Sequence, residues 1–428
     1  MAAAAHKNLM SLFRHNPPTR DDEVIRLFHN REAELDLALD RLRTLPDADK
    51  ILAIHGMPRS GKSHFALRLL LRLKEEGLPY SILRCNANSR GRARALLEEV
   101  FFKALKYIDD AKDGAPAEQV PHFDEYREYL ARFESVVGRD SAEFTLERTN
   151  TSASQSDAGA KLLLPPFELH ALSRNEAREA QLDRVLQKSL SERELAELLR
   201  YAFDLLALLH PEQRLLLFID DLDLLDRGQP GAPLEADRLQ EALKLLCEPP
   251  TLLDRSATLV LVTMRSDGFT DRDKDFEDFV AIRLLDPDQH VAIYERHIQQ
   301  FHAGEPIFTP QAIDWLEARS GGQVGMFLRR CREIFDFFYK RLSTGALIDE
   351  GHIKEYVRKD VKDLLRDESC GPVMLDVQRA VLAGQLDIEL TSEPGLLLHR
   401  VLSPSLGKNI YRINPLYRDA LVERKAGS

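Results

Sequence analysis

The 428-residue chain has few cysteines, no long apolar run and no excess of basic residues. The four cysteines form no Cys-x-x-Cys pair, which argues against a disulfide framework and the common zinc-site spacings. No apolar stretch approaches the roughly 18–20 residues that cross a bilayer. The opening residues, MAAAAHKNLM, lack the apolar core of a signal peptide. We therefore expect a cytoplasmic protein of several domains without a membrane partner.

The charge balance is acidic, with 70 Asp and Glu against 59 Lys and Arg. Binding of nucleic acid through bulk charge is disfavoured, because phosphate contacts need local lysine and arginine. The imbalance is uneven, since the chain from His352 onward has 12 basic and 11 acidic residues. A modest, local contact with DNA through the C-terminal part is therefore compatible with the composition.

One segment, Gly56 to Ser63, matches the phosphate-loop pattern G-x-x-x-x-G-K-[ST]. An apolar run, Ile51–His55, precedes it and a helical pattern, Phe65–Leu73, follows it, which is the context such a loop needs. Backbone N–H groups would hold the phosphates, Lys62 would contact the β- and γ-phosphates, and the Ser63 hydroxyl would bind Mg²⁺. The expected nucleotide-binding residues here are Gly56, Pro58, Arg59, Ser60, Gly61, Lys62, Ser63 and His64.

Arg59 stands where many such loops carry another glycine. The backbone there must tolerate a side chain. That side chain would point either at solvent or toward a partner subunit.

A second apolar run, Leu215–Ile219, ends in consecutive carboxylates. Asp220 would hold Mg²⁺ through water opposite Ser63, and Asp221 would orient the attacking water. Asp220 lies 158 positions after the loop lysine, Lys62. So long a gap indicates an insertion.

The insertion is expected at about 108–190, where the alternation of strands and helices is lost. It contains a polar, low-complexity stretch, Thr149–Ser156. A hairpin with a flexible tip is one interpretation of this region.

A third apolar run, Leu259–Val262, ends in Thr263-Met264-Arg265. In a parallel sheet this end faces the ligand, so Thr263 or Arg265 would sense the γ-phosphate. Alternatively, Arg265 bridges to a loop acid, Asp267 or Asp271. The expected catalytic residues are Lys62, Asp220, Asp221, Thr263 and Arg265, with Ser63 and Asp220 as the Mg²⁺ ligands.

Helical patterns dominate after an expected edge strand at Val280–Leu284. Asp286-Pro287-Asp288 opens one helix, Thr309-Pro310 caps another, and Gly321-Gly322 separates that one from a helix over Met326–Leu342. The chain then mixes short helices with two candidate strands at Leu397–Val401 and Tyr411–Ile413, which suggests a winged-helix module.

The sequence therefore predicts an α/β fold: a parallel-sheet P-loop NTPase core with a helical lid and a C-terminal winged-helix-like domain. The expected boundaries are a lead-in at 1–27, the ATPase core at 28–285, the lid at 286–345 and the C-terminal domain at 346–428.

The segment Leu27–Leu35 lies in a helical pattern that runs from Val24 to Leu45. It resembles the F-x-x-R-E-x-E-L first helix of origin-recognition-like AAA+ ATPases and of STAND signalling ATPases. That resemblance implies a nucleotide contact for Arg31 and makes Thr263 similar to sensor 1. Arg265 resembles the strand-terminal arginine of the STAND class, and the wording of Phe218–Asp223 is similar to KAP-type ATPases. The likeness covers about 28–106 and 196–345, and more loosely 350–428.

The segment Ser320–Arg330 resembles the lid segment that carries the sensor 2 arginine. Gly325 occupies the usual arginine position, which leaves Arg329 or Arg330, one helical turn on, as substitutes. For an arginine finger, the available cations between sensor 1 and the lid are Arg272 and Lys274.

Two hypotheses for function stay open, both built on ATP and Mg²⁺. The first is an oligomerising ATPase switch acting on DNA, in a process such as mobile-element control or anti-phage defence. Basic residues that favour it are Arg84, Arg90, Arg92, Arg94, Lys408, Arg412 and Arg418. The second is a STAND-like scaffold that recruits a separate effector protein without binding DNA. A small-molecule kinase fits less well, because the sequence offers no acceptor site.

Overall fold

The structure is a computed structural model of the 428-residue chain. It describes residues 13, 20–44, 51–87, 96–97, 99–101, 103–104, 192–210, 212–222, 225, 258–266, 278–302, 305–339, 346–390, 397, 400–404 and 410–426. The expected insertion at 108–190 lies outside these residues.

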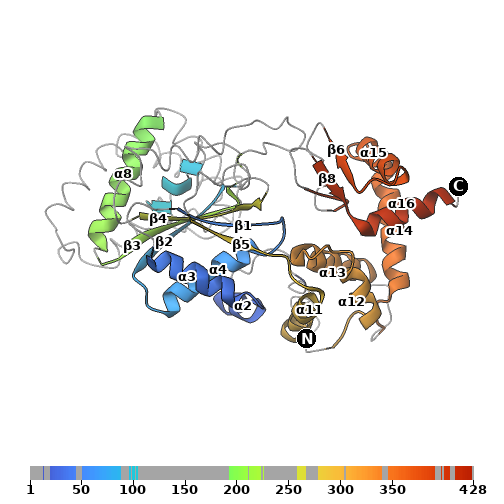
Figure 1. Ribbon diagram of the computed structural model, residues 1–428, viewed down its shortest axis with the longest axis horizontal. Helices are drawn as coiled ribbons and strands as arrows, with labels where there is room; N and C mark the ends of the chain where they lie inside the picture. Colours follow the sequence, from blue (N-terminus) through green and yellow to red (C-terminus); the bar gives the residue numbers. More distant parts are fainter. Residues whose placement is uncertain are drawn as a thin grey trace, which may run out of the picture.

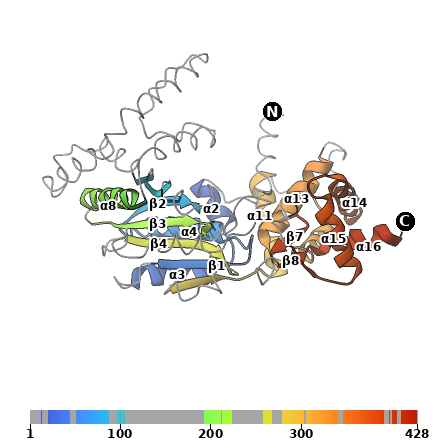
Figure 2. The same ribbon diagram turned by 90° about the horizontal axis from the view of Figure 1, so that it is seen from above.

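The core is a five-stranded parallel sheet with the strand order β2-β3-β4-β1-β5 (Figures 1 and 2). Its strands are β1 (Ile51–Gly56), β2 (Tyr80–Asn86), β3 (Arg214–Asp220), β4 (Thr258–Arg265) and β5 (Asp278–Ile282). Near-continuous apolar sequences suit strands that are covered on both faces. The four predicted strands are confirmed as β1, β3, β4 and β5, with β5 at the edge, although it ends at Ile282 rather than at the predicted Leu284. All five carboxyl ends meet at one edge, where open α/β sheets bind ligands.

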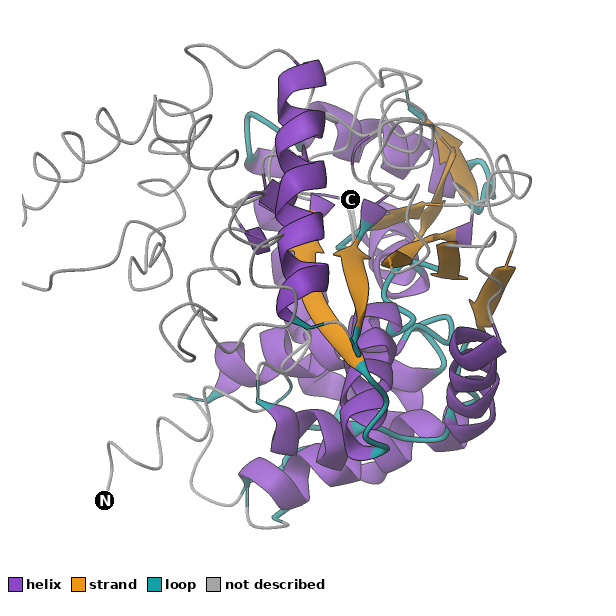
Figure 3. Cartoon of the chain, turned by 90° about the vertical axis from the view of Figure 1, so that its left-hand side faces the viewer, coloured by secondary structure: helices purple, strands orange, loops and turns teal. Residues whose placement is uncertain are grey.

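Helices cover both faces of this sheet. Helices α3 (Glu32–Thr44) and α4 (Lys62–Glu75) lie on one face, and α8 (Glu192–Leu209) lies on the other (Figure 1). Figure 3 shows α8 running along the strands in front of the sheet. The apolar sides of α3 and α4 form one buried cluster with the sheet, so the phosphate loop joins two well-packed elements.

The prediction of one continuous helix from Val24 to Leu45 is wrong. The chain instead forms α2 (Asp21–Leu27) and α3, separated by a non-helical break at residues 28–31. Asn30 has φ 52°, a left-handed conformation that asparagine tolerates better than most side chains. The apolar spacing continues across the break, which is why periodicity alone did not reveal it.

The edge strand β5 is covered in part by α3. The Arg41 guanidinium donates to the Asp278 carboxylate and to the Phe279 carbonyl. These contacts fasten α3 to the edge strand of the sheet.

Three helices follow the sheet: α11 (Pro287–Phe301), α12 (Pro310–Glu317) and α13 (Val324–Phe338). The starts of α11 and α12 agree with the sequence signals, since Asp286 forms a capping box and Thr309 Oγ1 accepts a hydrogen bond from Ala312 N at 3.2 Å. Helix α13 begins at Val324, two residues before the predicted start at Met326. Gly321 and Gly322 both have positive φ, as the turn before α13 requires.

The C-terminal module contains three helices and a three-stranded antiparallel sheet with the order β6-β8-β7. Its elements are α14 (Glu350–Arg366), α15 (Gly371–Leu382), β6 (Asp387–Glu389), β7 (Leu402–Pro404), β8 (Ile410–Ile413) and α16 (Pro415–Ala426). The predicted strand at Tyr411–Ile413 is confirmed within β8. Strand β6 was not predicted, because three residues give too short an alternation.

The predicted strand at Leu397–Val401 is wrong. The Arg400 and Val401 N–H groups both donate to Leu397 O, at 3.1 and 3.0 Å, which is a turn. Leu397 and Val401 are fully buried, so their apolar character reflects burial rather than an extended backbone.

Helices α11 to α16 share one hydrophobic core, which joins the lid to the C-terminal module. The chain is thus an α/β protein with a parallel-sheet P-loop core, followed by a helical lid and a C-terminal module. Among the described residues, no helix combines the length and apolar character needed to cross a membrane. The exact domain boundaries stay predictions.

Candidate nucleotide site

The phosphate loop connects β1 to α4, and its shape requires glycine at two positions. Gly61 has φ 97° at the start of α4, a conformation that favours glycine. A Cβ atom at Gly56 would lie 2.7 Å from Ile282 O and 2.9 Å from Ser60 Oγ, so no other residue fits between the loop and β5. The loop N–H groups and the start of α4 form the concavity that a phosphate-binding loop needs.

Lys62 lies inside this loop. Its Nζ donates to Gly56 O at 3.2 Å and to Met57 O at 3.0 Å, and only 6% of the residue is exposed. Carbonyl groups therefore hold a cation on the concave side of the loop. An anion that enters the loop would meet this charge directly.

The strand ends bring together the residues predicted to bind Mg²⁺. Ser63 Oγ donates to Asp220 Oδ1 at 2.9 Å, and Thr263 Oγ1 donates to the same oxygen at 2.5 Å. Asp220 and Thr263 are buried. Mg²⁺ in phosphate sites takes one or two protein oxygens together with waters and phosphate oxygens. The donor set of Ser63 and Asp220 fits that ion.

Asp221 follows in a strained conformation. Its φ is 55°, which non-glycine residues rarely adopt, and its N–H donates to Thr263 Oγ1 at 2.8 Å. The strand ends at Asp220, and the chain turns at the next residue. Thr263 therefore positions both acids: its hydroxyl donates to the Asp220 carboxylate and accepts from the Asp221 backbone N–H. Asp223 lies outside the described residues.

Arg31 supports the loop from the break between α2 and α3. Its Nη2 donates to Ser60 O at 2.9 Å and to Arg283 O at 2.8 Å, and 5% of the residue is exposed. Burial lowers the pKa of this guanidinium, against the opposing charge of Glu34. Arg31 thus ties the loop to the exit of β5. Its contact with a nucleotide stays a prediction.

His64 and Arg265 are near the loop but differ in their surroundings. His64 Nε2 lies 2.9 Å from Val24 O, and burial lowers the pKa of its imidazole. Arg265 ends β4 directly beside Gly56 of β1 and is half-buried. The alternative partners proposed for Arg265, Asp267 and Asp271, lie outside the described residues. The roles of His64 and Arg265 in nucleotide binding stay predictions.

The Arg59 side chain does not lie in open solvent, which is one of its two expected positions, but is half-buried against the first turn of α13. The other expected position, toward a partner subunit, stays a prediction. Gly325 N donates to Arg59 O at 2.9 Å, and a Cβ atom at Gly325 would lie 2.9 Å from Arg59 Cβ. Arg59 has φ 58°, so the loop accepts a left-handed residue to make this contact. The absence of a side chain at 325 is therefore what lets the lid approach the loop.

The two lid arginines have separate surroundings. Arg329 Nε pairs with Glu333 Oε1 at 2.8 Å on the side of α13 whose charges act on Arg59. Arg330 is 3% exposed and donates to Tyr417 Oη at 3.1 Å and to Arg400 O. Two arginines were considered as substitutes for the sensor 2 arginine. Of these, Arg330 bonds to the C-terminal module, whereas Arg329 lies beside the loop.

Sequence reasoning missed Glu333. Its carboxylate pairs with Arg329 and Arg330, and Tyr356 Oη lies 3.5 Å from Glu333 Oε2. The spacing of four residues from Arg329 is a helical ion-pair signal that the sequence contains. The predicted finger residues, Arg272 and Lys274, lie outside the described residues. Within those residues, no group of three or more His, Cys, Asp or Glu side chains is arranged to hold a metal ion by itself.

No protein-family model matches the chain, and no curated protein matches it. Similar solved structures include Cdc6p from Pyrobaculum aerophilum, at 12% identity over 97% of this chain and 98% of that one, with a TM-score of 0.45. The Aeropyrum pernix ORC2 protein, in ADPNP–ADP complexes, has 12% identity over 97% and 98%, with a TM-score of 0.42. The Aeropyrum pernix ORC1 protein in complex with DNA has 14% identity over 95% of each chain, with a TM-score of 0.43. At these values, the fold class rests on the sheet order and the phosphate loop.

Proposed function

We propose that the chain is a Mg²⁺-dependent ATP hydrolase that works as an oligomerising switch in a DNA-linked process. One observation carries the ATPase part: Ser63, Asp220 and Thr263 converge at the sheet edge beside the Lys62 loop, although they come from three separate parts of the sequence. Neighbouring hydroxyl, carboxylate and ammonium groups at a phosphate loop suit a metal–triphosphate ligand.

Each residue has a defined task in this proposal. The loop N–H groups and Lys62 bind the phosphates, and Ser63 and Asp220 hold the ion. When bound, Mg²⁺ would neutralise charge on the β- and γ-phosphates. Asp221 orients the attacking water, and Thr263 keeps Asp220 and Asp221 in position through its two hydrogen bonds.

The switch part is supported by the contact between loop and lid. The Gly325–Arg59 hydrogen bond places the start of α13 directly on the phosphate loop. Because α13 also contributes to the core of the C-terminal module, a change at the loop reaches that module through packed residues. Nucleotide-dependent joining of subunits would follow from such a change.

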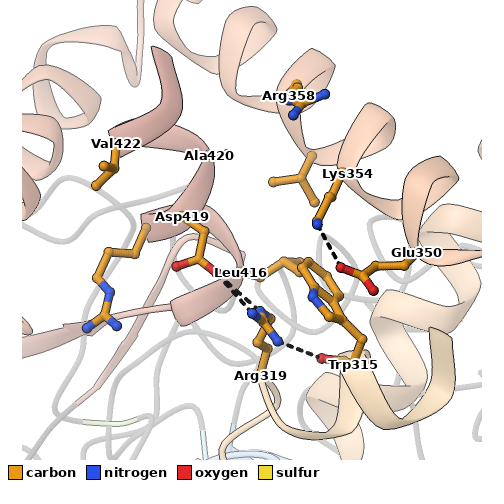
Figure 4. A pocket seen from close by; sticks show the side chains of 11 residues that line it. Trp315, Arg319, Glu350, Lys354, Arg358, Leu416, Asp419, Ala420 and Val422 are labelled. Atoms are coloured by element: carbon orange, nitrogen blue, oxygen red, sulfur yellow. Dashed lines mark hydrogen bonds and ion pairs between the residues drawn. The ribbon is translucent and has the colours of Figure 1, made fainter. Parts of the chain in front are cut away.

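The DNA part is supported by a basic groove of about 520 Å³ between α12, α14 and α16 (Figure 4). Trp315 forms one wall, with the Arg319 guanidinium 4.0 Å from its ring centroid. Arg319 pairs with Asp419, whereas Arg358 and Arg418 add positive charge along the groove.

The basic groove continues along α14. Lys354, Arg358, Lys362 and Arg366 recur every fourth residue, at an axial spacing of about 6 Å, and the first of them, Lys354, pairs with Glu350 at 2.7 Å. A regular row of cations on an acidic chain favours a linear polyanion such as a nucleic-acid backbone. Of the basic residues first considered, Arg412 is paired with Asp387, and Lys408, Arg90, Arg92 and Arg94 lie outside the described residues.

ATP turnover tests the proposal first. Lys62→Ala should abolish nucleotide binding, because the loop loses its only lysine. Asp221→Asn should preserve binding and slow hydrolysis about 100-fold, as expected when a water-orienting group is lost. Arg72→Ala, on the outer side of α4, is the control and should behave as wild type. Wild-type protein without Mg²⁺-dependent ATP turnover would overturn the ATPase assignment.

Duplex binding at several salt concentrations tests the DNA part. Removing Arg358 and Lys362 together should weaken binding across sequences and lower the salt slope by roughly one per lost phosphate contact. Arg379→Ala, an exposed ion-paired residue of α15, is the control. If wild type binds no DNA but its gel-filtration size changes with ATP and Mg²⁺, the scaffold alternative replaces the DNA-linked switch.

A further inference from the structure

The face of the phosphate loop toward the lid has more positive than negative charge. Arg59 lies on the loop, Arg329 lies opposite on α13, and Arg330 follows it. The nearest carboxylate on α13, Glu333, already pairs with both Arg329 and Arg330. Among the described residues, Glu333 is therefore paired with two of the three guanidinium groups, and Arg59 is the third.

Arg59 is the member of this group without its own acceptor. Its Nε is buried and has no hydrogen-bond partner in the described part of the chain. Burial, followed by the like charge of Arg329, lowers the pKa of Arg59 to about 10. A buried N–H donor without an acceptor is costly, and an anion within reach would remove that cost.

The loop determines which anion this is. Its N–H groups and Lys62 surround the inner phosphates, and Ser63 with Asp220 marks the metal side. Asp221 lies close enough to Arg59 for its charge to raise the pKa of the guanidinium. An anion held between Arg59 and the end of β3 would be the outermost phosphate, which a diphosphate lacks.

The lid cannot supply this cation from its first turn. A side chain at Gly325 would collide with Arg59, whose carbonyl already accepts the Gly325 N–H. The positive charge has to come from the loop side, or from one turn further along α13, where Arg329 lies. An arginine at position 59 therefore requires a glycine at position 325.

We propose that Arg59, with Arg329 beside it, binds the terminal phosphate of a nucleoside triphosphate and is the residue by which the site distinguishes triphosphate from diphosphate. This inference rests on the proposed nucleotide site and assigns to Arg59 the recognition of the terminal phosphate there. The same contact links the terminal phosphate to α13, because Arg329 belongs to the lid.

The test compares two nucleotides in the full-length protein. Titration calorimetry with Mg²⁺ measures the dissociation constants for ADP and for the slowly hydrolysed analogue ATPγS. Arg59→Gly is the main variant, since φ 58° suits glycine and the loop should keep its shape. Arg59→Lys retains the charge without the guanidinium, and Arg72→Ala is the control.

Arg59→Gly should weaken ATPγS binding roughly 10- to 100-fold, the value of a hydrogen bond to a charged group, and leave ADP binding nearly unchanged. Arg59→Lys should lose less, and Arg72→Ala should match wild type. Equal losses for the two nucleotides would mean that Arg59 only shapes the loop, and no loss would mean that it makes no contact. Either result overturns the inference while the proposed nucleotide site stands. A wild-type protein that binds neither nucleotide overturns both.

Discussion

Two buried carboxylates, one in the nucleotide site and one in the C-terminal module, have nearly the same burial and different partners. Asp220 is 4% exposed and Asp360 is 6% exposed. In the described part of the chain, Asp220 accepts hydrogen bonds only from the hydroxyls of Ser63 and Thr263. Asp360 accepts from both Nε and Nη2 of Arg400 and from Tyr417 Oη.

The difference is one of charge compensation. Neutral hydroxyls orient Asp220 without cancelling its charge, so the site keeps an attraction for a cation. A guanidinium cancels the charge of Asp360, and the resulting network joins α14 to α16. Burial alone therefore does not identify a functional acid, whereas the type of donor around it does.

The largest expected effect is a loss of stability when Asp360, the carboxylate paired with a guanidinium, is removed. Asp360→Ala should lower the free energy of unfolding by about 3–5 kcal/mol, because Arg400 loses its carboxylate partner. Urea unfolding followed by the fluorescence of Trp315, the single tryptophan, measures this where the lid meets the module. Asp376→Ala removes only an exposed ion pair on α15 and should cost about 0–1 kcal/mol. Equal losses for the two variants would break the comparison.

Asp220→Asn should show the opposite pattern. ATP turnover should fall about 10²- to 10³-fold, as when a group that stabilises transition-state charge is removed. Stability should be retained, because the amide relieves an uncompensated buried charge. The Mg²⁺-dependent rise in melting temperature with nucleotide should disappear as well. A stability loss as large as that of Asp360→Ala would show that Asp220 is structural.

The smallest effect is a pH dependence of the lid–module junction. Burial would raise the pKa of Glu333, but the Arg330 and Arg329 guanidinium groups outweigh it and lower the pKa in the folded protein. A lowered folded-state pKa adds stability that is present above the unfolded value of about 4.3. This stability is lost as the pH falls through the folded pKa. Unfolding measured from pH 7 to pH 3 should show a shallower acid decline for Glu333→Gln than for wild type.

The sequence was most informative where local chemistry decides the structure. The strand, glycine loop and helix around Gly56–Ser63 form as predicted. The glycine with positive φ and the spacing of the phosphate-loop pattern both lie within these eight residues, so local sequence is enough to predict them. Strands β3 and β4 were equally readable from apolar runs that end in polar residues. Their convergence on Ser63 followed from the rule that parallel strands end at one sheet edge.

Features that depend on distant contacts could not be predicted. Arg59 and Gly325 lie far apart in the chain, and nothing local shows that one carbonyl will accept a hydrogen bond from the other's N–H. The break at Asn30 depends on packing that lets Arg31 reach both Ser60 and Arg283. Both features depend on contacts between segments that lie far apart in the sequence.

The Arg31 contacts also have a mechanical consequence. By bonding to Arg283 O, this side chain fixes the chain to the core up to the end of β5. Two residues later, Leu285 N donates to Gly322 O at 3.3 Å and already belongs to the lid. Along the chain, the last core contact and the first lid contact are therefore only two residues apart, with Leu284 between them. Since the lid and the C-terminal module share one core, a rotation of the lid about Leu284 would carry the module with it and would displace the groove on α14 farther than the start of α13.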